Sequence, residues 1–157
     1  HTVQYLGSTY IALSSNLNDP PPSGNWNLIA QGGENTFSLE KTSIFITSST
    51  STSFVTINAM SETPPPGKFF VSFSTTGKGD TTDQQQDYGI FVGGVLVQHS
   101  LRTINYDNAT SDKNQRITLH TQAIVTTNGS ELVEIQYKVN NGVFTIYERS
   151  LTLLQLS

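Results

Sequence analysis

The segment 64–74, PPPGKFFVSFS, shows most directly how this chain folds. After the prolines and Gly67, large apolar residues occupy every second position, at Phe69, Val71 and Phe73. Side chains at i and i+2 of a β-strand lie on one face of a sheet, so this spacing predicts a strand with one apolar face. The prolines and the glycine predict a turn before it, because both residue types favour turns.

The same alternation continues on either side of this segment, and helical periodicity is almost absent. In the segment 132–139, LVEIQYKV, the apolar residues again fall on every second position, and in 116–125, RITLHTQAIV, Ile117, Leu119 and Val125 share a face. Four more runs are rich in β-branched and aromatic residues, which favour strands. They are SIFIT (43–47), SFVTINA (53–59), YGIFV (88–92) and VLVQH (95–99).

Short turn signals separate these runs. Gly93 with Gly94, Asn128 with Gly129, and the segment 140–142 (NNG) each predict a hairpin turn. The polar stretches 77–87 and 106–115 predict longer loops. Residues from about 34 to 157 therefore carry about eight short strands, and the predicted fold is all-β, an antiparallel jelly-roll sandwich.

Composition limits the classes of function. Only 13% of the 157 residues are charged, the net charge is −4 and cysteine is absent. This composition is typical of extracellular β-proteins and viral shells, and it gives no basic surface for nucleic acid. No apolar run reaches the roughly 20 residues of a membrane-spanning helix, so no membrane insertion is predicted. The segment 47–53, TSSTSTS, predicts a flexible loop.

The first 33 residues differ from the rest. They place Tyr5, Tyr10 and Trp26 among glycines and a triple proline at 20–22. We expect residues 1–33 to form a short β-rich connector and residues 34–157 to form the head domain.

No pattern of catalytic residues is present. The three histidines are His1, His99 and His120, and none accompanies a G-x-S-x-G nucleophile elbow. Glu131 lies next to a turn and on the opposite strand face from Glu134, so the two do not form the carboxylate pair of a glycosidase. We therefore expect no enzymatic activity.

One loop offers oxygen ligands for a metal ion. Asp80, Asp83 and Asp87 lie in the sequence GDTTDQQQD, and calcium binds six to eight oxygens that often include carboxylates. Calcium is thus a candidate ligand of this loop. A solvated polar loop explains the same residues, and no other cofactor is predicted.

Residues from 34 onward resemble the trimeric jelly-roll heads of the complement globular-head and tumour-necrosis-factor-like superfamily. The resemblance rests on three stretches: 64–74, PPPGKFFVSFS; 88–102, YGIFVGGVLVQHSLR; and 133–156, VEIQYKVNNGVFTIYERSLTLLQL. It implies a homotrimer without enzymatic activity, of the kind found at the tips of fibres and collagen-like stalks.

The opening segment resembles chitin-binding-type carbohydrate-binding modules. Tyr5, Gly7, Tyr10 and Ala12 match the pattern Tyr-x-Gly-x-x-Tyr-x-Ala, and the proline-rich turn and Trp26 follow. This resemblance implies that Tyr5, Tyr10 and Trp26 stack on a sugar. The alternative is that these aromatic residues form the small core of the connector.

The last strands are apolar on both faces. Phe144 and Ile146 fall on one face, and Val143 and Tyr147 on the other. A strand buried on both faces has this pattern, so Phe144, Ile146 and Tyr147 are predicted at the trimer interface.

Two functions remain open from the sequence. The first is the homotrimeric head of a fibre or stalk, extracellular on a virion, a phage fibre or a bacterial surface, which binds a cell-surface glycan or protein receptor. The second is a lectin-like carbohydrate-binding module that acts through Trp26 and its neighbours.

Overall fold

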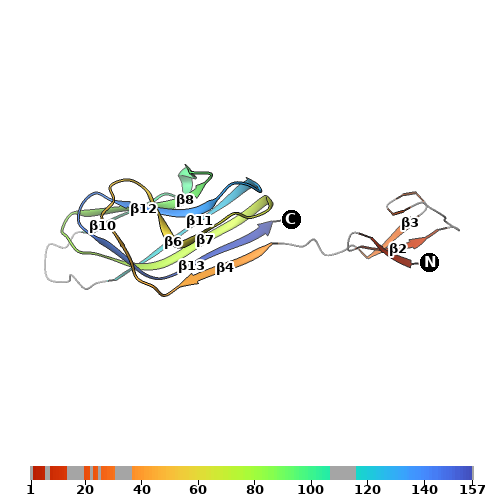
Figure 1. The fold of residues 1–157 in the computed structure, drawn as a ribbon, viewed down its shortest axis with the longest axis horizontal. Coiled ribbons are helices and arrows are strands. Elements are labelled where there is room, and N and C mark those ends of the chain that lie inside the picture. Colours follow the sequence, from red (N-terminus) through yellow and green to blue (C-terminus); the bar gives the residue numbers. More distant parts are fainter. Residues whose placement is uncertain are drawn as a thin grey trace. The chain divides into compact units, whose positions relative to one another are not determined.

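The computed structural model describes residues 2–5, 8–13, 20–21, 23–24, 26–30, 37–106 and 116–156. Contacts divide the chain into two units, His1–Thr36 and Phe37–Ser157, here called the N-terminal unit and the head (Figure 1). The division falls after Thr36, whereas the sequence placed it after residue 33. Both positions lie in 31–36, outside the described residues.

In its described part, the head consists of ten strands and one short 3-10 helix at Gln98–Ser100. The strands are β4 (Ser38–Ser43), β5 (Thr47–Ser49), β6 (Val55–Glu62), β7 (Pro66–Gly79), β8 (Gln84–Val92), β9 (Val95–Leu96), β10 (Arg102–Tyr106), β11 (Ile117–Asn128), β12 (Val133–Val139) and β13 (Phe144–Leu156). Within the described residues, no helix is long and apolar enough to cross a membrane.

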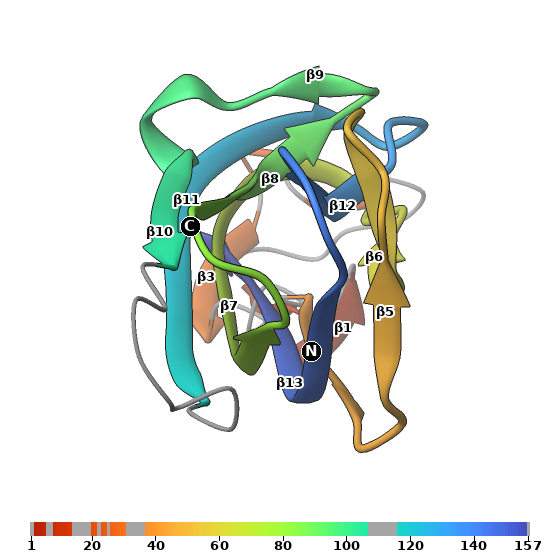
Figure 2. The ribbon, with the colours of Figure 1, turned by 90° about the vertical axis from the view of Figure 1, so that its left-hand side faces the viewer.

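Eight of these strands form two sheets. The β13 sheet has the order β11–β7–β13–β4 and the β12 sheet has the order β10–β8–β12–β6, while β5 pairs with β13 and β9 with β8. Along the chain the first strand pairs with the last, β4 with β13, and the pairs β6–β12, β7–β11 and β8–β10 follow inward, all antiparallel. A chain that is doubled back and wrapped in this way is a jelly roll. The predicted fold class is therefore confirmed, and Figure 2 shows the strands surrounding the core.

One of the three predicted hairpins is confirmed. Gly93 and Gly94 join β8 to β9, and their φ angles of 55° and 79° match the left-handed backbone of a tight hairpin turn. The other two are wrong: Asn128 and Gly129 join β11 to β12, and the turn at 140–142 joins β12 to β13, so each connects one sheet with the other. Turn residues predict where a strand ends, but not which sheet the next strand joins.

The predicted loop at 77–87 is also too long. β7 continues to Gly79 and β8 begins at Gln84, so the connection is only 80–83. Gln84 and Gln86 are polar but buried within β8, which is why composition suggested a loop. Of the second predicted loop, residues 107–115 lie outside the described residues.

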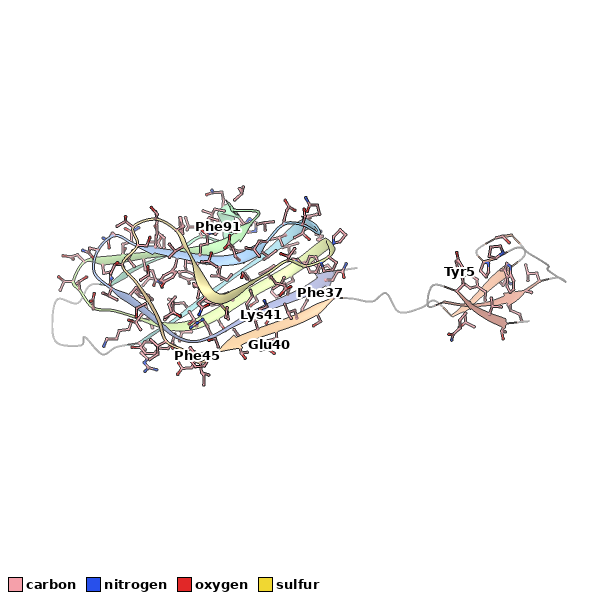
Figure 3. All side chains as sticks on the ribbon, viewed as in Figure 1. Tyr5, Phe37, Glu40, Lys41, Phe45 and Phe91 are labelled. Carbon is pink, nitrogen blue, oxygen red and sulfur yellow. The ribbon has the colours of Figure 1, made fainter. Side chains whose placement is uncertain are left out.

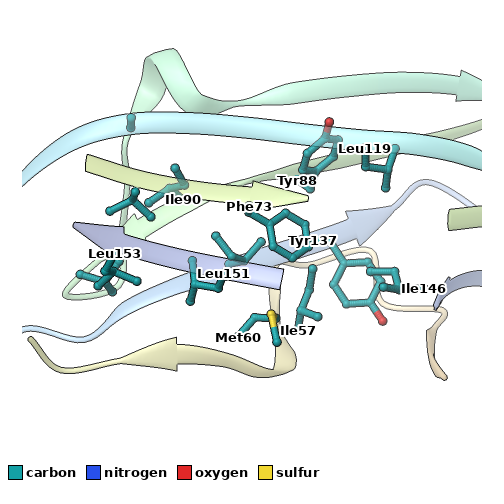
Figure 4. Packing of buried hydrophobic residues seen from close by; sticks show 14 of the residues in the cluster. Ile57, Met60, Phe73, Tyr88, Ile90, Leu119, Tyr137, Ile146, Leu151 and Leu153 are labelled. Atoms are coloured by element: carbon teal, nitrogen blue, oxygen red, sulfur yellow. The ribbon is translucent and has the colours of Figure 1, made fainter. Parts of the chain in front are cut away.

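The core lies between the two sheets (Figure 4). It is filled by the apolar side chains that alternate along the strands, as the sequence predicted. Phe69, Val71 and Phe73 of β7 are fully buried, as the spacing predicted. The β12 sheet contributes the alternate residues of β12 on the facing side. The other members that Figure 4 labels are Ile57, Met60, Tyr88, Ile90, Leu119, Tyr137, Ile146, Leu151 and Leu153.

The N-terminal unit contains a small antiparallel sheet. Its strands β1 (Thr2–Tyr5), β2 (Ser8–Ala12) and β3 (Trp26–Ala30) pair in the order β1–β2–β3. The β-rich character expected for this segment is therefore present in its described residues.

Candidate functional site

Tyr5, Tyr10 and Trp26 lie on one face of the N-terminal sheet. Val3 pairs with Tyr10 across β1 and β2, and Ala12 pairs with Trp26 across β2 and β3. Paired residues share a face, and so do residues two apart on one strand. Tyr5 follows Val3 by two residues and Ala12 follows Tyr10 by two, so the structure brings the three predicted aromatic residues onto the same face.

The exposure of this aromatic face suits both hypotheses for it. Tyr5 is 38% exposed, whereas Tyr10 and Trp26 are half-buried. The backbone N–H of Trp26 donates a hydrogen bond to the Ser23 carbonyl at 3.1 Å, which closes the turn before β3. Half-buried rings can form a small core or offer a flat surface to the CH groups of a sugar. The predictions of a sugar site and of a core therefore both stay predictions.

The structure does not bring the three predicted calcium ligands together. Asp80 accepts a hydrogen bond from the Val143 N–H at 2.7 Å, and the Asp83 carbonyl accepts one from Asn140 at 3.1 Å. Asp87 lies in β8. Among the described residues, no three His, Cys, Asp or Glu side chains form a group able to hold a metal ion. These loop residues therefore do not form the ligand cluster that the calcium prediction requires.

Asp87 belongs instead to a polar row on the outer face of the β12 sheet. Its carboxylate accepts hydrogen bonds from Thr103 at 2.7 Å and from Gln85 at 3.1 Å, and it lies 3.4 Å from the Lys138 ammonium. Burial acts to raise the pKa of Asp87, but these hydrogen bonds and the Lys138 charge together outweigh it, so the pKa is lowered. Glu134, hydrogen-bonded to Thr56, adds another charged side chain to this face.

Two of the three predicted interface residues are in the core, so this part of the prediction is wrong. Phe144 is 1% exposed and Ile146 is 0% exposed in the single chain, and both point between the two sheets. The chain itself therefore supplies the burial that the prediction assigned to a neighbouring subunit. Tyr147 is half-buried, and the Arg116 guanidinium lies 3.7 Å from the centre of its ring.

The outer face of the β13 sheet carries an apolar row. Leu154 of β13 pairs with Phe70 of β7, and Phe70 pairs with Ile124 of β11. These three residues, called the apolar row below, thus lie side by side on three adjacent strands. Leu154 is 41% exposed and Ile124 is 51% exposed, while Phe70 is half-buried. Phe70 stands in the sequence as the second phenylalanine of FFVSFS, but no sequence pattern indicated its alignment with Ile124 and Leu154.

The next two rows of this face are polar but contain no Asp, Glu, Lys or Arg on β13, β7 and β11. Their side chains hydrogen-bond to one another: Ser74 to Ser150 at 2.9 Å, and Ser72 to His120 at 3.3 Å. The two outer faces of the sandwich therefore differ, because the polar row of the β12 sheet carries ionic groups, whereas the apolar row and the two polar rows of the β13 sheet carry none on β13, β7 and β11. The rows are Thr152–Ser72–Gln122 and Ser150–Ser74–His120.

A second apolar surface lies at the edge of the β13 sheet, in the connection between β4 and β5. Ile44, Phe45 and Ile46 are 78%, 76% and 65% exposed, and we call these residues the 44–46 loop. The sequence predicted a strand through SIFIT, but these three residues lie between strands. A shallow depression of about 390 Å³ lies beside Ile44 and is lined mainly by Ser and Thr side chains.

The buried Arg149 lies beneath this loop. Its guanidinium donates hydrogen bonds to the carbonyls of Phe45, Asn58 and Tyr147 and to the Thr47 hydroxyl. Burial lowers the pKa of Arg149, with an opposing effect of Tyr137, yet a guanidinium keeps its charge in proteins. The sequence offered no signal for this arrangement, because Phe45, Thr47 and Asn58 are about a hundred residues from Arg149 along the chain.

Comparisons with known proteins show which solved structures share this fold. No protein-family model and no curated protein sequence matches the chain. Among solved structures, the VP2 subviral particle of infectious bursal disease virus has 10% identity and a TM-score of 0.54, over 97% of this chain and 40% of that chain. A viral particle of the same virus has 8% identity and a TM-score of 0.55, over 97% and 38%. Dimeric latent PorU from Porphyromonas gingivalis has 8% identity and a TM-score of 0.52, over 76% and 12%.

At this level of identity the likeness establishes the fold alone. The chain spans about two fifths of the length of the infectious bursal disease virus chains that it matches. The comparisons confirm neither the complement and tumour-necrosis-factor-like superfamily nor the chitin-binding modules. They agree with the topology in making the head an antiparallel jelly-roll sandwich.

Proposed function

We propose that this chain is the non-enzymatic, homotrimeric head of a fibre or collagen-like stalk, displayed on a virion, a phage fibre or a bacterial cell surface. The observation that carries the proposal is the outer face of the β13 sheet, where β13, β7 and β11 present the apolar row and, beside it, two rows without Asp, Glu, Lys or Arg. Such a face fits a contact between subunits.

The outer face of the β13 sheet is a better subunit contact than that of the β12 sheet, because burying it removes fewer charged groups from water. An ionised group buried in an interface costs several kcal/mol unless it is well paired. The outer face of the β12 sheet carries the ionic groups of Asp87, Lys138 and Glu134, whereas the two polar rows of the β13 sheet offer hydroxyl, amide and imidazole groups, several of which already bond to one another. Three copies that bury the β13 face around a threefold axis leave the ionic β12 face toward solvent.

A trimer of this kind recognises its target by repetition. A loop contact that is weak in one copy occurs three times in the assembly, and linked sites gain avidity through effective concentration. The partner would be a cell-surface glycan or a protein receptor. The likeness of the head to VP2, a protein of viral particles, supports a structural role on a virion.

A charge placed on the outer face tests the proposal. We expect Ile124→Glu to reduce the assembled mass of the full chain, because each copy would bury an unpaired carboxylate. Val95 is 71% exposed at the start of β9, so Val95→Glu is the matched control and should leave the mass unchanged. Equal masses for wild type, Ile124→Glu and Val95→Glu would show that this face makes no subunit contact.

Carbohydrate binding by the N-terminal unit is the second candidate, favoured by the shared face of Tyr5, Tyr10 and Trp26. Trp26→Ala separates it from a purely structural role. If Trp26 belongs to a small core, the variant should be cleaved faster by protease within residues 1–33 while the head stays folded. If the variant instead keeps its protease resistance and loses binding to chitin, the aromatic face is a sugar site.

A further inference from the structure

Three consecutive large apolar side chains at one exposed loop are unusual for a monomer. Soluble monomers expose single apolar residues freely, but contiguous apolar patches commonly mark interaction sites. Ile44, Phe45 and Ile46 are each more than three-fifths exposed, and Figure 3 shows Phe45 at the margin of the head beside β4. The 44–46 loop is therefore a candidate binding surface.

The loop is held in place rather than loosely attached. Arg149, only 3% exposed, donates to the Phe45 carbonyl and to the Thr47 hydroxyl, and so bonds to the loop and to the strand after it. The Phe45 N–H donates to the Ser43 hydroxyl at 3.3 Å, so both backbone polar groups of Phe45 are satisfied within the chain. An apolar group fixed beforehand loses less conformational entropy when it binds.

The position of the loop gives the geometry of its contact. β4 pairs with Arg149 to Leu154 of β13 and β5 pairs with Phe144 to Ile146, so the loop lies opposite the middle of β13. It is therefore at one edge of the β13 sheet, the β4 edge. Ile124 of the apolar row is on β11, the strand at the other edge of the same sheet. The 44–46 loop thus lies at one edge of the sheet, and the apolar row reaches the opposite edge at Ile124.

We infer that the 44–46 loop of one copy packs against the apolar row of the next copy. The inference rests on the proposed trimer and names the residues of its contact. A contact between two different patches repeats head to tail, and it closes into a ring when the rotation permits. The stretch 42–53 contains no charged residue, and neither does the apolar row, so the side chains that meet in this contact are all uncharged.

A lipid surface is less well suited to the loop than a second copy. Glu148 lies on β13 opposite the loop with a well-exposed side chain. Hydrogen bonds from its own backbone N–H and from Thr76 lower the pKa of this carboxyl, so it is ionised at neutral pH. The loop lies opposite the middle of β13, close to this carboxylate. Insertion of the loop into a bilayer surface would therefore bring the negative charge of Glu148 to the lipid as well.

The absence of cysteine from the chain permits a direct test by cross-linking. A full chain with both Phe45→Cys and Ile124→Cys is treated with a short bismaleimide. If residue 45 of each copy lies against residue 124 of the next, the denaturing gel shows a covalent trimer. Each single variant can give at most a dimer, because it has one thiol. Val95→Cys with Ile124→Cys is the matched control and should give no covalent trimer.

A second measurement concerns the energy of the contact. We expect Phe45→Ser to raise the protein concentration needed for half-assembly at least tenfold, as loss of a buried aromatic anchor does, and Val95→Ser to change it less than twofold.

A trimeric wild type without the 45–124 product would overturn the inference and leave the proposed trimer standing. A monomeric wild type at micromolar concentration would remove both. Flotation of such a monomer with phosphatidylcholine vesicles, lost in Phe45→Ser, would assign the loop to lipid instead.

Discussion

At the scale of single residues, the shape of the 44–46 loop depends on Arg149. Arg149→Lys keeps the positive charge but replaces a planar fork of donors by a single ammonium, which cannot reach the carbonyls of Phe45 and Asn58 together with the Thr47 hydroxyl. We expect the variant to lose about 2 kcal/mol of unfolding free energy, measured by denaturant titration. Arg116→Lys, at a far more exposed guanidinium, should lose about 0.5 kcal/mol or less. Equal losses would show that the hydrogen bonds of Arg149 add nothing.

Asp87 gives a prediction of pH dependence. Its pKa is lowered in the folded protein, so it stabilises the fold above its unfolded pKa of about 3.9 and ceases to do so as the pH falls through the folded pKa. The difference in unfolding free energy between wild type and Asp87→Asn should be on the order of 1 kcal/mol at neutral pH. It should shrink when the pH falls below about 4. A difference that is constant from neutral pH to pH 3 would mean that shape, not ionisation, explains the effect.

At the scale of elements, the contact between β7 and β13 depends on Gly77. A Cβ at this position would overlap the ring of Phe144 and approach Leu119 Cδ1 to 3.2 Å, and both side chains are buried. We expect Gly77→Ala to lower the unfolding free energy by about 1–3 kcal/mol, as overpacked cores do. In a Phe144→Leu background the same substitution should cost less, by at least about 0.5 kcal/mol, and additive losses would contradict this account.

Also at this scale, the sequence predicted the faces of regular strands and failed where a strand is irregular. The positions of Phe69, Val71 and Phe73 followed from alternation alone. In β13 a bulge lies between Ile146 and Arg149, so Tyr147 and Glu148 both point outward and the alternation changes phase there. Alternation cannot reveal such a bulge, and the apolar residues on both faces were therefore assigned to a subunit interface. The exposure of SIFIT was missed because it depends on Arg149, about a hundred residues away.

At the scale of the whole molecule, the sequence predicted a jelly roll but not its connections. Composition and strand number indicated a sandwich, yet only one of three predicted hairpins joins neighbouring strands of one sheet. The pairing of β4 with β13 joins residues more than a hundred positions apart, and no local pattern encodes it. The apolar row on the β13 sheet depends on this long-range register, so that candidate surface became visible only with the structure.

The mass of the wild-type full chain in solution tests the central claim most directly. Light scattering after size exclusion, at micromolar protein concentration, should give three times the chain mass of 17.1 kDa, because three copies bury the apolar row and the neighbouring polar rows of the β13 sheet. A single species of 17.1 kDa under these conditions would contradict the account.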